Sequence, residues 1–149
     1  GCPGWLNGMI IADYYIRSGD AKKILVIGAE TLSRVSDPHD RDSMLYADGA
    51  GATILEGIKK GSAQGIISHS TRSDTLEHAY MLWMDKTYHP TNGCGDLFLK
   101  MKGHQLYEYA LKTVPAVIKE GLDKAGLGIH DIKKDCKELN SVERELYDL

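Results

Sequence analysis

The first hydrophobic segment of the chain predicts a helix over residues 3–18. Pro3 suits the first helical position, because its missing N–H would have no acceptor there, and Gly19 suits a left-handed C-terminal cap. Apolar residues occupy nearly all sides of this segment, which is typical of a helix buried on most of its surface. They are Leu6, Met9, Ile10, Ile11, Ala12, Tyr14, Tyr15 and Ile16.

Three shorter apolar runs follow and predict strands. Residues 24–29 form a continuous apolar run, typical of a strand covered on both faces. Residues 53–55 and 65–70 predict two further strands. A helix, a short turn and a buried strand in this order indicate an α/β class with layered architecture.

Apolar spacing returns to the helical period from about residue 100 to residue 125, and Gly126 and Gly128 end that helix. Residues 31–47 and 71–98 read as irregular. We find no internal repeat and no low-complexity tract.

Charge and cysteine content narrow the function classes. The net charge of −3 lacks the basic surplus of a nucleic-acid-binding protein, so we expect no such partner. No apolar run approaches the roughly 18 residues that cross a membrane, and the N-terminal segment does not read as a signal peptide, so we expect no membrane association. Three widely spaced cysteines without a Cys-x-x-Cys pair argue against a disulfide framework or a zinc site and favour the reducing cytoplasm.

Cys2 is the leading candidate for chemistry. Its position before Pro3 places the sulfur at a helix N-terminus, where unpaired N–H groups and the helix dipole favour the thiolate. A thiolate is the form that attacks a thioester, and the same N–H groups suit a tetrahedral oxyanion. The alternative is that Cys2 is a small buried hydrophobic residue.

Residues 48–52 read Asp-Gly-Ala-Gly-Ala and lead into a predicted strand. The run lacks the lysine of a phosphate-binding loop and the full dinucleotide-binding spacing. Small residues at a strand entrance more often allow close backbone packing, so we interpret this run as structural.

Several segments together resemble the β-ketoacyl-[acyl-carrier-protein] synthase III family of thiolase-fold condensing enzymes. The resemblance runs from residue 1 to about 134 and is strongest over 1–56. The segments on which the resemblance rests are Gly1-Cys2-Pro3-Gly4-Trp5, the following helix, the strand to Gly28, Asp37-Pro38 with Arg41, and Tyr46 to Ala52.

The resemblance implies part of the αβαβα layered thiolase fold. Residues 1–57 would form the C-terminal part of the N-terminal thiolase half, and residues 58–134 the start of the C-terminal half. The chain opens without an initiator methionine and already inside a motif, so we expect a piece of a longer protein.

The resemblance also implies an activity. Cys2 would accept an acyl group from acyl-CoA, and the acyl group would condense with malonyl-acyl carrier protein with loss of carbon dioxide, initiating fatty-acid synthesis. No cofactor is implied beyond the coenzyme A thioester as substrate. Members of the family are homodimers.

Arg41 matches the family arginine that stacks near the adenine of coenzyme A. A guanidinium beside a loop can stack on a base and pair with phosphate. The alternative is an ion pair with one of the neighbouring carboxylates of Asp37, Asp40 and Asp42.

Other residues match the substrate-binding positions of the family. Tyr46 aligns with the aromatic residue that closes the acyl pocket, Leu32 with another lining position, and Trp5, Leu32 and Tyr46 would set primer length. Core packing is the alternative for Leu32 and Tyr46, and it does not exclude a lining role. Met101 and Gly103 match a stretch beside the pantetheine tunnel.

The chain departs from the family after about Lys134. The family's His-Gln-Ala-Asn run, whose His and Asn stabilise the enolate formed on decarboxylation, is absent, and residues 135–149 form a charged tail instead. His130 precedes the place of that run and His104 falls at the start of the long helix, so neither is assigned. We therefore predict acylation of Cys2 without condensation.

The remaining histidines and cysteines show no partner spacing for a metal. We interpret the histidines as surface or hydrogen-bonding residues and the cysteines as incidental thiols. They are His39, His69, His78, His89, Cys94 and Cys136.

Two further hypotheses stay open. A related thiolase-fold synthase would use another primer, as chalcone-type or hydroxymethylglutaryl-CoA-type enzymes do. Alternatively, the chain is catalytically silent and keeps only association surfaces.

Overall fold

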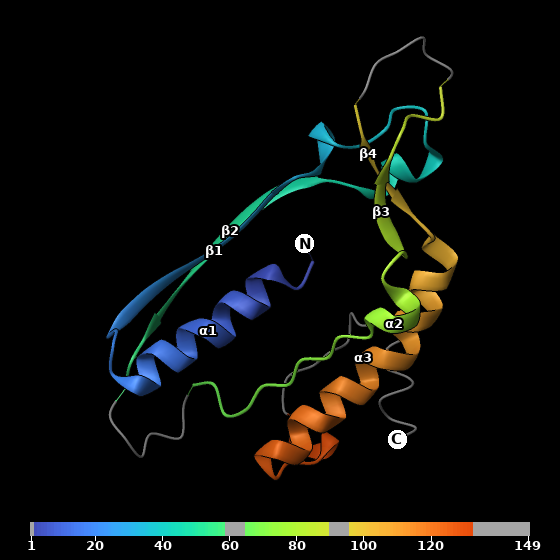
Figure 1. Cartoon of the computed structure of the whole chain (residues 1–149). Helices are drawn as coiled ribbons and strands as arrows, with labels where there is room; N and C mark the ends of the chain where they lie inside the picture. Colours follow the sequence, from blue (N-terminus) through green and yellow to red (C-terminus); the bar gives the residue numbers. More distant parts are fainter. Residues whose placement is uncertain (1, 59–64, 90–95, 133–149) are drawn as a thin grey trace. The chain divides into compact units, whose positions relative to one another are not determined.

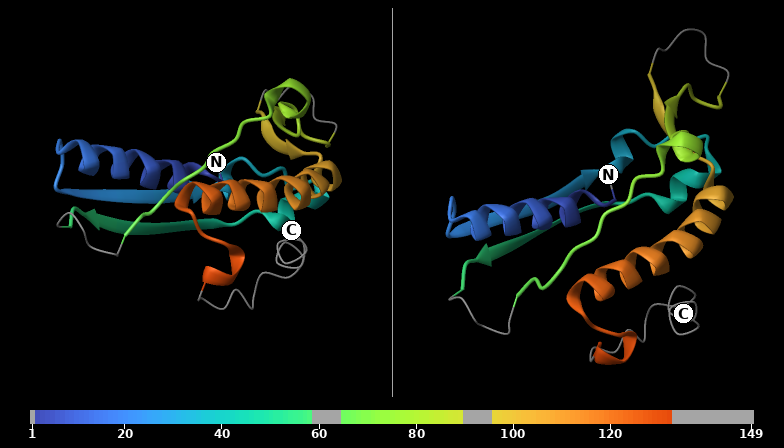
Figure 2. Two further views of the ribbon diagram at one scale, coloured as in Figure 1. Left: turned by 90° about the horizontal axis from the view of Figure 1, so that it is seen from below. Right: turned by 60° about the horizontal axis from the view of Figure 1, so that its bottom comes forward.

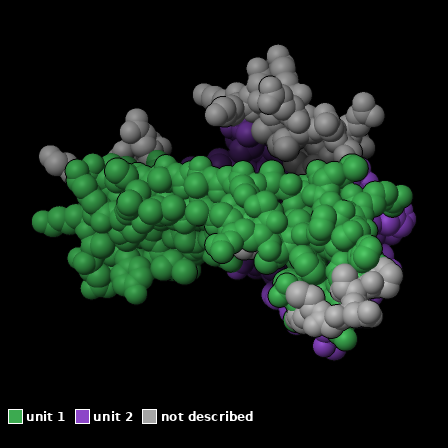
Figure 3. Space-filling model, turned by 90° about the horizontal axis from the view of Figure 1, so that it is seen from above, with its two compact units in different colours: residues 1–66, 84–99 green, residues 67–83, 100–149 purple. Residues whose placement is uncertain are grey.

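The computed structural model describes residues 2–58, 65–89 and 96–132 (Figure 1). The chain divides into two compact units, which Figure 3 distinguishes by colour. Unit 1 comprises residues 1–66 and 84–99, and unit 2 comprises residues 67–83 and 100–149. The predicted boundary between the thiolase halves at residues 57 and 58 comes from the family resemblance. The compact units do not test it, and it stays a prediction.

Unit 1 begins with helix α1, Gly4–Ser18, which confirms the predicted helix to within one residue. Pro3 lies at the N-cap, one position ahead of the expected one. Gly19 caps the C-terminus in the left-handed conformation with φ 88°, and its N–H donates to the Ile16 carbonyl. A residue with a side chain would be strained there.

Strands β1, Lys23–Thr31, and β2, Asp48–Glu56, pair antiparallel, with Val26 opposite Thr53 and Gly28 opposite Gly51. Helix α1 lies along one face of this hairpin (Figures 1 and 2). A Cβ atom on Gly8 would lie 2.9 Å from Val26 Cγ1. The missing side chain of Gly8 therefore lets the helix approach the strand closely.

Only this face of the hairpin is covered by the described part of the chain. Val26 points toward α1 and is 7% exposed, whereas Leu25 and Ile27 alternate with it and are 57% and 62% exposed. The expectation of a strand covered on both faces is wrong for this chain. The expected burial of the first helix is wrong for the same reason, because α1 buries only the side that meets β1 and β2. Its exposed large side chains are Trp5, Leu6, Ile11, Tyr14 and Tyr15.

The run of small residues at 48–52 belongs to β2, which is longer than the predicted strand 53–55. A Cβ atom on Gly49 or Gly51 would meet no described atom within 4 Å. The close-packing interpretation of this run therefore finds no support among the described residues. The close approach occurs instead at Gly8 and Gly28.

A long connection joins β1 to β2 through two 3₁₀ helices, Leu32–Arg34 and Arg41–Leu45. Asp37 lies between them and is fully buried. Its carboxylate accepts hydrogen bonds from Thr87 Oγ1 at 2.9 Å and Tyr88 N at 2.8 Å. These bonds fix the connection to residues about 50 positions further along the chain.

The predicted strand at 65–70 is wrong, because these residues are irregular. The Ile66 carbonyl accepts a hydrogen bond at 2.8 Å from Arg17, whose guanidinium also forms an ion pair with Asp13 at 2.7 Å. A side chain of α1, rather than a neighbouring strand, therefore satisfies this carbonyl.

The described part of unit 2 contains helices α2, Thr75–His78, and α3, Gly103–Ala125, followed by the 3₁₀ helix Ile129–Asp131. The predicted helix 100–125 is confirmed except at its start, where residues to Met101 belong to a strand. Gly126, at φ 68°, caps α3 in the left-handed conformation as predicted.

Strands β3, Leu82–Asp85, and β4, Phe98–Met101, pair into a second ribbon, and the unit boundary passes through it. Together with α2, they show that the segment 71–98 is less irregular than expected. No described helix is both long enough and apolar enough to cross a membrane. The predicted charged tail at 135–149 and the thiols Cys94 and Cys136 lie outside the described residues.

Candidate active site

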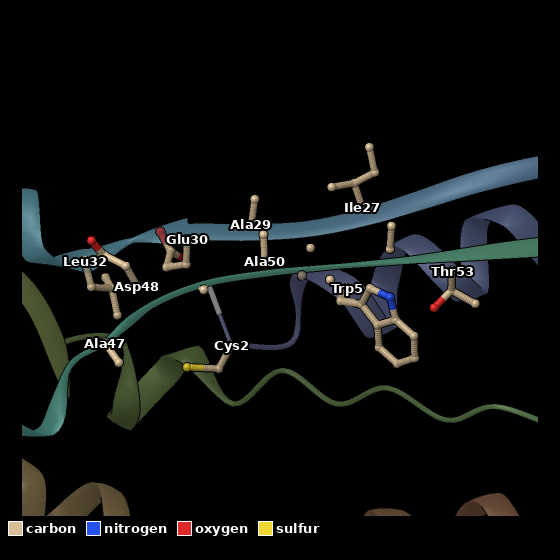
Figure 4. A pocket seen from close by; sticks show the side chains of 15 residues that line it. Cys2, Trp5, Ile27, Ala29, Glu30, Leu32, Ala47, Asp48, Ala50 and Thr53 are labelled. Atoms are coloured by element: carbon tan, nitrogen blue, oxygen red, sulfur yellow. The ribbon is translucent and has the colours of Figure 1, made fainter.

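An open pocket of about 970 Å³ lies in unit 1, where the start of α1 meets the two paired strands (Figure 4). Cys2 and Trp5 line the pocket from the N-terminal end of α1. Their side chains lie on one side of the two strands, and the Ile27 side chain lies on the other side (Figure 4). The residues that line the pocket are Cys2, Gly4, Trp5, Ile27, Gly28, Ala29, Glu30, Leu32, Ala47, Asp48, Gly49, Ala50, Gly51, Ala52 and Thr53.

Cys2 carries an exposed free thiol just ahead of α1. At the helix start, Asn7 N donates to the Pro3 carbonyl at 2.9 Å. The amides of a helix's first turn have no acceptor inside the helix, and they are available to a negatively charged group at this end. The alternative of Cys2 as a small buried residue is wrong, because the thiol is exposed.

Trp5 forms one wall of the pocket and packs against β1. A Cβ atom on Gly28 would lie 3.0 Å from Trp5 Cβ and 3.3 Å from its Cδ1. Glycine at position 28 is what permits the indole to lie this close to the strand. The pocket wall therefore depends on the pair Trp5 and Gly28.

Asp48 fixes the opposite end of the pocket. Ser33 N donates to Asp48 Oδ1 at 2.8 Å, and the Ser33 hydroxyl donates to Asp48 Oδ2. The hydroxyl first, and then the backbone N–H, hold the pKa of this carboxyl below its usual 3.8. The ionised Asp48 thus anchors the 3₁₀ turn that carries Leu32 into the pocket lining.

The structure brings three of the predicted site residues together, since Cys2, Trp5 and Leu32 all line this pocket. Tyr46 directly precedes the lining residue Ala47, but it is not itself among the described lining residues.

Arg41 lies in the same unit, as the exposed first residue of its 3₁₀ helix. Two of the three carboxylates expected as its alternative partners accept other donors. The Asp40 side chain accepts a hydrogen bond from Asp42 N at 3.0 Å, and Asp37 accepts from residues 87 and 88. Gly103 begins α3 in unit 2. The substrate-binding roles of these residues stay predictions.

Sequence reasoning missed the residues that hold the site in place. The sequence indicates Asp48 only as part of a small-residue run, because its donor Ser33 lies 15 positions earlier in the chain. No sequence motif indicates a role for Ser33. The sequence indicates Asp37 only as part of the family motif and as an alternative partner of Arg41, because its donors at residues 87 and 88 are too distant in sequence to be paired by spacing.

The described residues contain no group of at least three His, Cys, Asp or Glu side chains placed to hold a metal ion. His104 lies 3.3 Å from Glu108 on the surface of α3, and His130 lies in the 3₁₀ helix after it. His39 and His89 contact each other, with ring centroids 4.5 Å apart.

Comparison with known proteins identifies the family. A family profile described as 3-Oxoacyl-[acyl-carrier-protein (ACP)] synthase III matches residues 1–75. Beta-ketoacyl-[acyl-carrier-protein] synthase III of Brucella anthropi is 37% identical over 135 residues, which are 88% of this chain and 41% of that protein.

Solved structures agree with the sequence comparison. Synthase III from Thermus thermophilus matches with a TM-score of 0.78 at 28% identity, covering 98% of this chain and 47% of that one. The priming β-ketosynthase of the R1128 polyketide biosynthetic pathway matches with a TM-score of 0.74 at 28% identity, covering 88% and 39%.

The chain therefore spans less than half the length of the proteins it matches. The predicted α/β class and the thiolase fold are confirmed by these structural matches, and the profile covers α1, the β1–β2 pair and the long connection between these strands. The chain belongs to the 3-oxoacyl-[acyl-carrier-protein] synthase III family.

Proposed function

We propose that this chain carries the acyl-accepting part of a 3-oxoacyl-[acyl-carrier-protein] synthase III, with Cys2 as the nucleophile. The observation that carries this proposal is the exposed Cys2 thiol, which lies at the start of α1 and lines the same pocket as Trp5 and Leu32. A nucleophile needs access, a site for the acyl chain and donors for the oxyanion, and this corner of unit 1 offers all three.

The proposed step is a transfer between two thioesters. Cys2 loses its thiol proton to solvent, and the sulfur attacks the carbonyl carbon of acyl-CoA. The tetrahedral oxyanion faces the first-turn amides of α1. It collapses with cleavage of the bond to the coenzyme A sulfur, which leaves as a thiolate and takes a proton from water. The products are acyl-Cys2 and free coenzyme A.

Condensation is the step that we do not assign to this chain. Attack of the malonyl carbanion on acyl-Cys2 requires groups that stabilise the enolate, which the family supplies with a His and an Asn. His104 is occupied by Glu108 on a helix surface, and the His-Gln-Ala-Asn run is absent from the sequence. We propose malonyl-acyl carrier protein as the partner of the complete enzyme, a homodimer of the cytoplasm.

The test is mass spectrometry of the chain after incubation with acetyl-CoA. We expect one acetyl group on the peptide that contains Cys2. Cys2→Ala should remove the adduct, while Cys94→Ala and Cys136→Ala are matched controls that should keep it. Folded protein without an adduct on Cys2, or with equal labelling of all three thiols, would contradict the proposal.

A second primer class is supported by one observation, the structural match to a priming β-ketosynthase of a polyketide pathway. The open pocket suits acyl groups longer than acetyl, since it is lined by glycine and alanine along both strands. A panel of acyl-CoA thioesters of increasing length decides this, and faster labelling of Cys2 by a longer primer than by acetyl-CoA favours the second class.

The remaining alternative is a catalytically silent chain. Its support is the apolar outer face of the hairpin, where Leu25, Ile27 and Ile54 are exposed. A chain that associates through this face and stays unlabelled by every thioester in the panel would establish it.

A further inference from the structure

Two histidines from distant parts of unit 1 lie in contact with each other. The imidazole rings of His39 and His89 have centroids 4.5 Å apart and planes inclined by 40°. His39 belongs to the connection between β1 and β2, and His89 follows β3, about 50 positions later in the chain. Both side chains are exposed, so the pair belongs to the surface of the unit and not to its core.

One buried carboxylate holds the backbone of both segments that carry these histidines. Asp37 is fully buried, and its Oδ1 accepts hydrogen bonds from His39 N at 3.0 Å and Thr87 Oγ1 at 2.9 Å. Its Oδ2 accepts a hydrogen bond from Tyr88 N at 2.8 Å. His89 N in turn donates to Thr87 Oγ1 at 3.1 Å. The two imidazoles are therefore attached to short segments whose hydrogen bonds meet at the same acid.

Asp37 also faces the ring of His39. Its Oδ1 lies 3.6 Å from His39 Nδ1, which is beyond hydrogen-bond length but places the negative charge on the Nδ1 side of the imidazole. A carboxylate on that side favours the tautomer that carries its proton on Nδ1, and this tautomer keeps the Nε2 lone pair for a metal ion. Carboxylates behind metal-binding histidines act in this way.

The spacing of the two rings suits a shared metal ion. An imidazole nitrogen binds zinc at about 2.0–2.1 Å, so two rings on neighbouring positions of one ion have centroids about 4.5–5 Å apart. The observed 4.5 Å lies at the short end of this range. Two imidazoles fill only part of a coordination sphere, and water supplies the other positions. The pair is therefore distinct from a centre with three or more protein ligands, which the described residues do not contain.

The chemistry of the ligands selects the class of ion. Imidazole nitrogen suits divalent transition ions such as Zn²⁺, Ni²⁺ and Cu²⁺, whereas Mg²⁺ and Ca²⁺ prefer oxygen ligands. We propose that His39 and His89 chelate one divalent transition-metal ion and that Asp37 is the residue that positions them. The bound ion links the connection between β1 and β2 to the segment after β3. The proposal does not depend on acylation of Cys2.

The test is isothermal titration calorimetry of the full chain with Zn²⁺ alone. The three cysteines are replaced by serine so that thiols do not compete, and circular dichroism verifies that this parent variant keeps the fold. We expect one Zn²⁺ per chain, a dissociation constant in the micromolar range, and no binding of Mg²⁺. His39→Ala and His89→Ala should each raise the dissociation constant about tenfold or more, because chelation makes the second bond intramolecular. A parent variant that binds no Zn²⁺ would overturn the site.

The double variant of His39→Ala and His89→Ala distinguishes a shared ion from two separate surface histidines. If both rings bind the same ion, each single variant should lose nearly as much affinity as the double variant. Separate histidines would instead lose binding in two equal steps, which would overturn the chelate. Undiminished binding in the double variant would overturn the site itself.

The matched control is His130→Ala, which removes an exposed histidine of the 3₁₀ helix Ile129–Asp131 in unit 2. Its dissociation constant should equal that of the parent. Weakening as large as that of His39→Ala would mean that Zn²⁺ binds surface histidines without selection, against the proposal. Electron paramagnetic resonance with Cu²⁺ gives an independent readout, since coupling to two imidazole nitrogens is expected in the parent and should be lost in either single variant.

The positioning role of Asp37 is tested through Thr87, because an Asp37 variant leaves buried donors without their acceptor. Thr87→Val removes the hydroxyl that joins Asp37 Oδ1 to His89 N. It should weaken Zn²⁺ binding severalfold, and Thr87→Ser should restore it. A purely structural role of this hydroxyl would lower the melting temperature without changing the dissociation constant, and that result would overturn the positioning role.

Discussion

Each compact unit contains a carboxylate that joins distant segments, and the two differ in burial. Asp37 in unit 1 is fully buried and is bound by backbone and hydroxyl donors. Asp74 in unit 2 keeps 27% of its side chain exposed and is bound by Tyr109 at 2.7 Å and Arg72 at 2.8 Å.

The comparison shows what each acid contributes. Water cannot replace the partners of Asp37, so its donors and its charge depend entirely on this arrangement. Water can replace part of the bonding of Asp74, whose partners include the exposed Arg72 guanidinium. Unit 1 therefore relies on its buried acid for loop structure, while unit 2 uses its acid as a surface connection.

The largest effect is expected from Asp37→Ala. The change leaves several buried donors without an acceptor, and we expect the free energy of unfolding to fall by about 3 kcal/mol. Urea denaturation followed by circular dichroism measures it. Asp40→Ala is the matched control, because it removes one capping bond and should cost only about 1 kcal/mol. Equal costs for the two variants would refute the distinction by burial.

Gly8→Ala should have the next largest effect. The added Cβ would lie 2.9 Å from Val26 Cγ1, which forces α1 away from β1. Overpacking of this kind costs about 1–3 kcal/mol. Gly121→Ala in α3 is the control, since its Cβ would meet nothing within 4 Å. It should stabilise the chain by up to about 1 kcal/mol through helix propensity, and thermal denaturation separates the two.

A smaller effect is expected at the pocket wall. In Gly28→Ala the new Cβ would lie 3.0 Å from Trp5 Cβ, so the indole must shift. We expect labelling of Cys2 by acetyl-CoA to slow about threefold to tenfold, equivalent to a loss of about 1 kcal/mol. Gly49→Ala, which meets nothing within 4 Å, is the paired control on β2. Unequal slowing places the effect at the Trp5 contact.

The smallest effect concerns the pH dependence of unit 2. The Tyr109 hydroxyl, followed by Arg72, holds the pKa of Asp74 below 3.8, and the same contact raises the pKa of Tyr109 above 10.0. The lowered acid stabilises the fold above pH 3.8 and loses this contribution as the pH falls through its folded pKa. The raised phenol stabilises the fold below pH 10.0 and loses this contribution above its folded pKa.

Tyr109→Phe should therefore lower stability at neutral pH and converge with the wild type in strong acid and strong base. Denaturation midpoints across the pH range measure this, and Tyr107→Phe in the same helix is the control. A constant difference between Tyr109→Phe and the wild type at all pH values would contradict the assignment.

The sequence allowed the regular elements to be predicted where a long apolar period coincided with glycine caps. Residues 3–18 and 100–125 are such cases, and Gly19 and Gly126 end the helices as expected. Hydrophobicity predicted the strand at 24–29, but it did not predict how many faces of that strand are buried. The burial of a face depends on which other elements pack against it. The segment 65–70 had strand-like composition, yet its carbonyl at Ile66 bonds to a helix side chain.

In the candidate site, too, some residues could be predicted from the sequence and others could not. Cys2, Trp5 and Leu32 followed from the motif, and the structure places them around one pocket. The supports Asp48, Ser33 and Asp37 depend on contacts between residues distant in sequence, which no local period reveals. The residues that line the pocket were therefore more predictable than the contacts that hold them in place.

The position of Trp5 also gives the site an optical reporter. The chain has only two tryptophans, and Trp83 lies in the other unit. With Trp83→Phe, the remaining indole emission arises from the pocket wall beside Cys2. Occupation of the pocket by an acyl chain should shift that fluorescence, so the proposed acylation of Cys2 can be followed in real time without a labelled substrate.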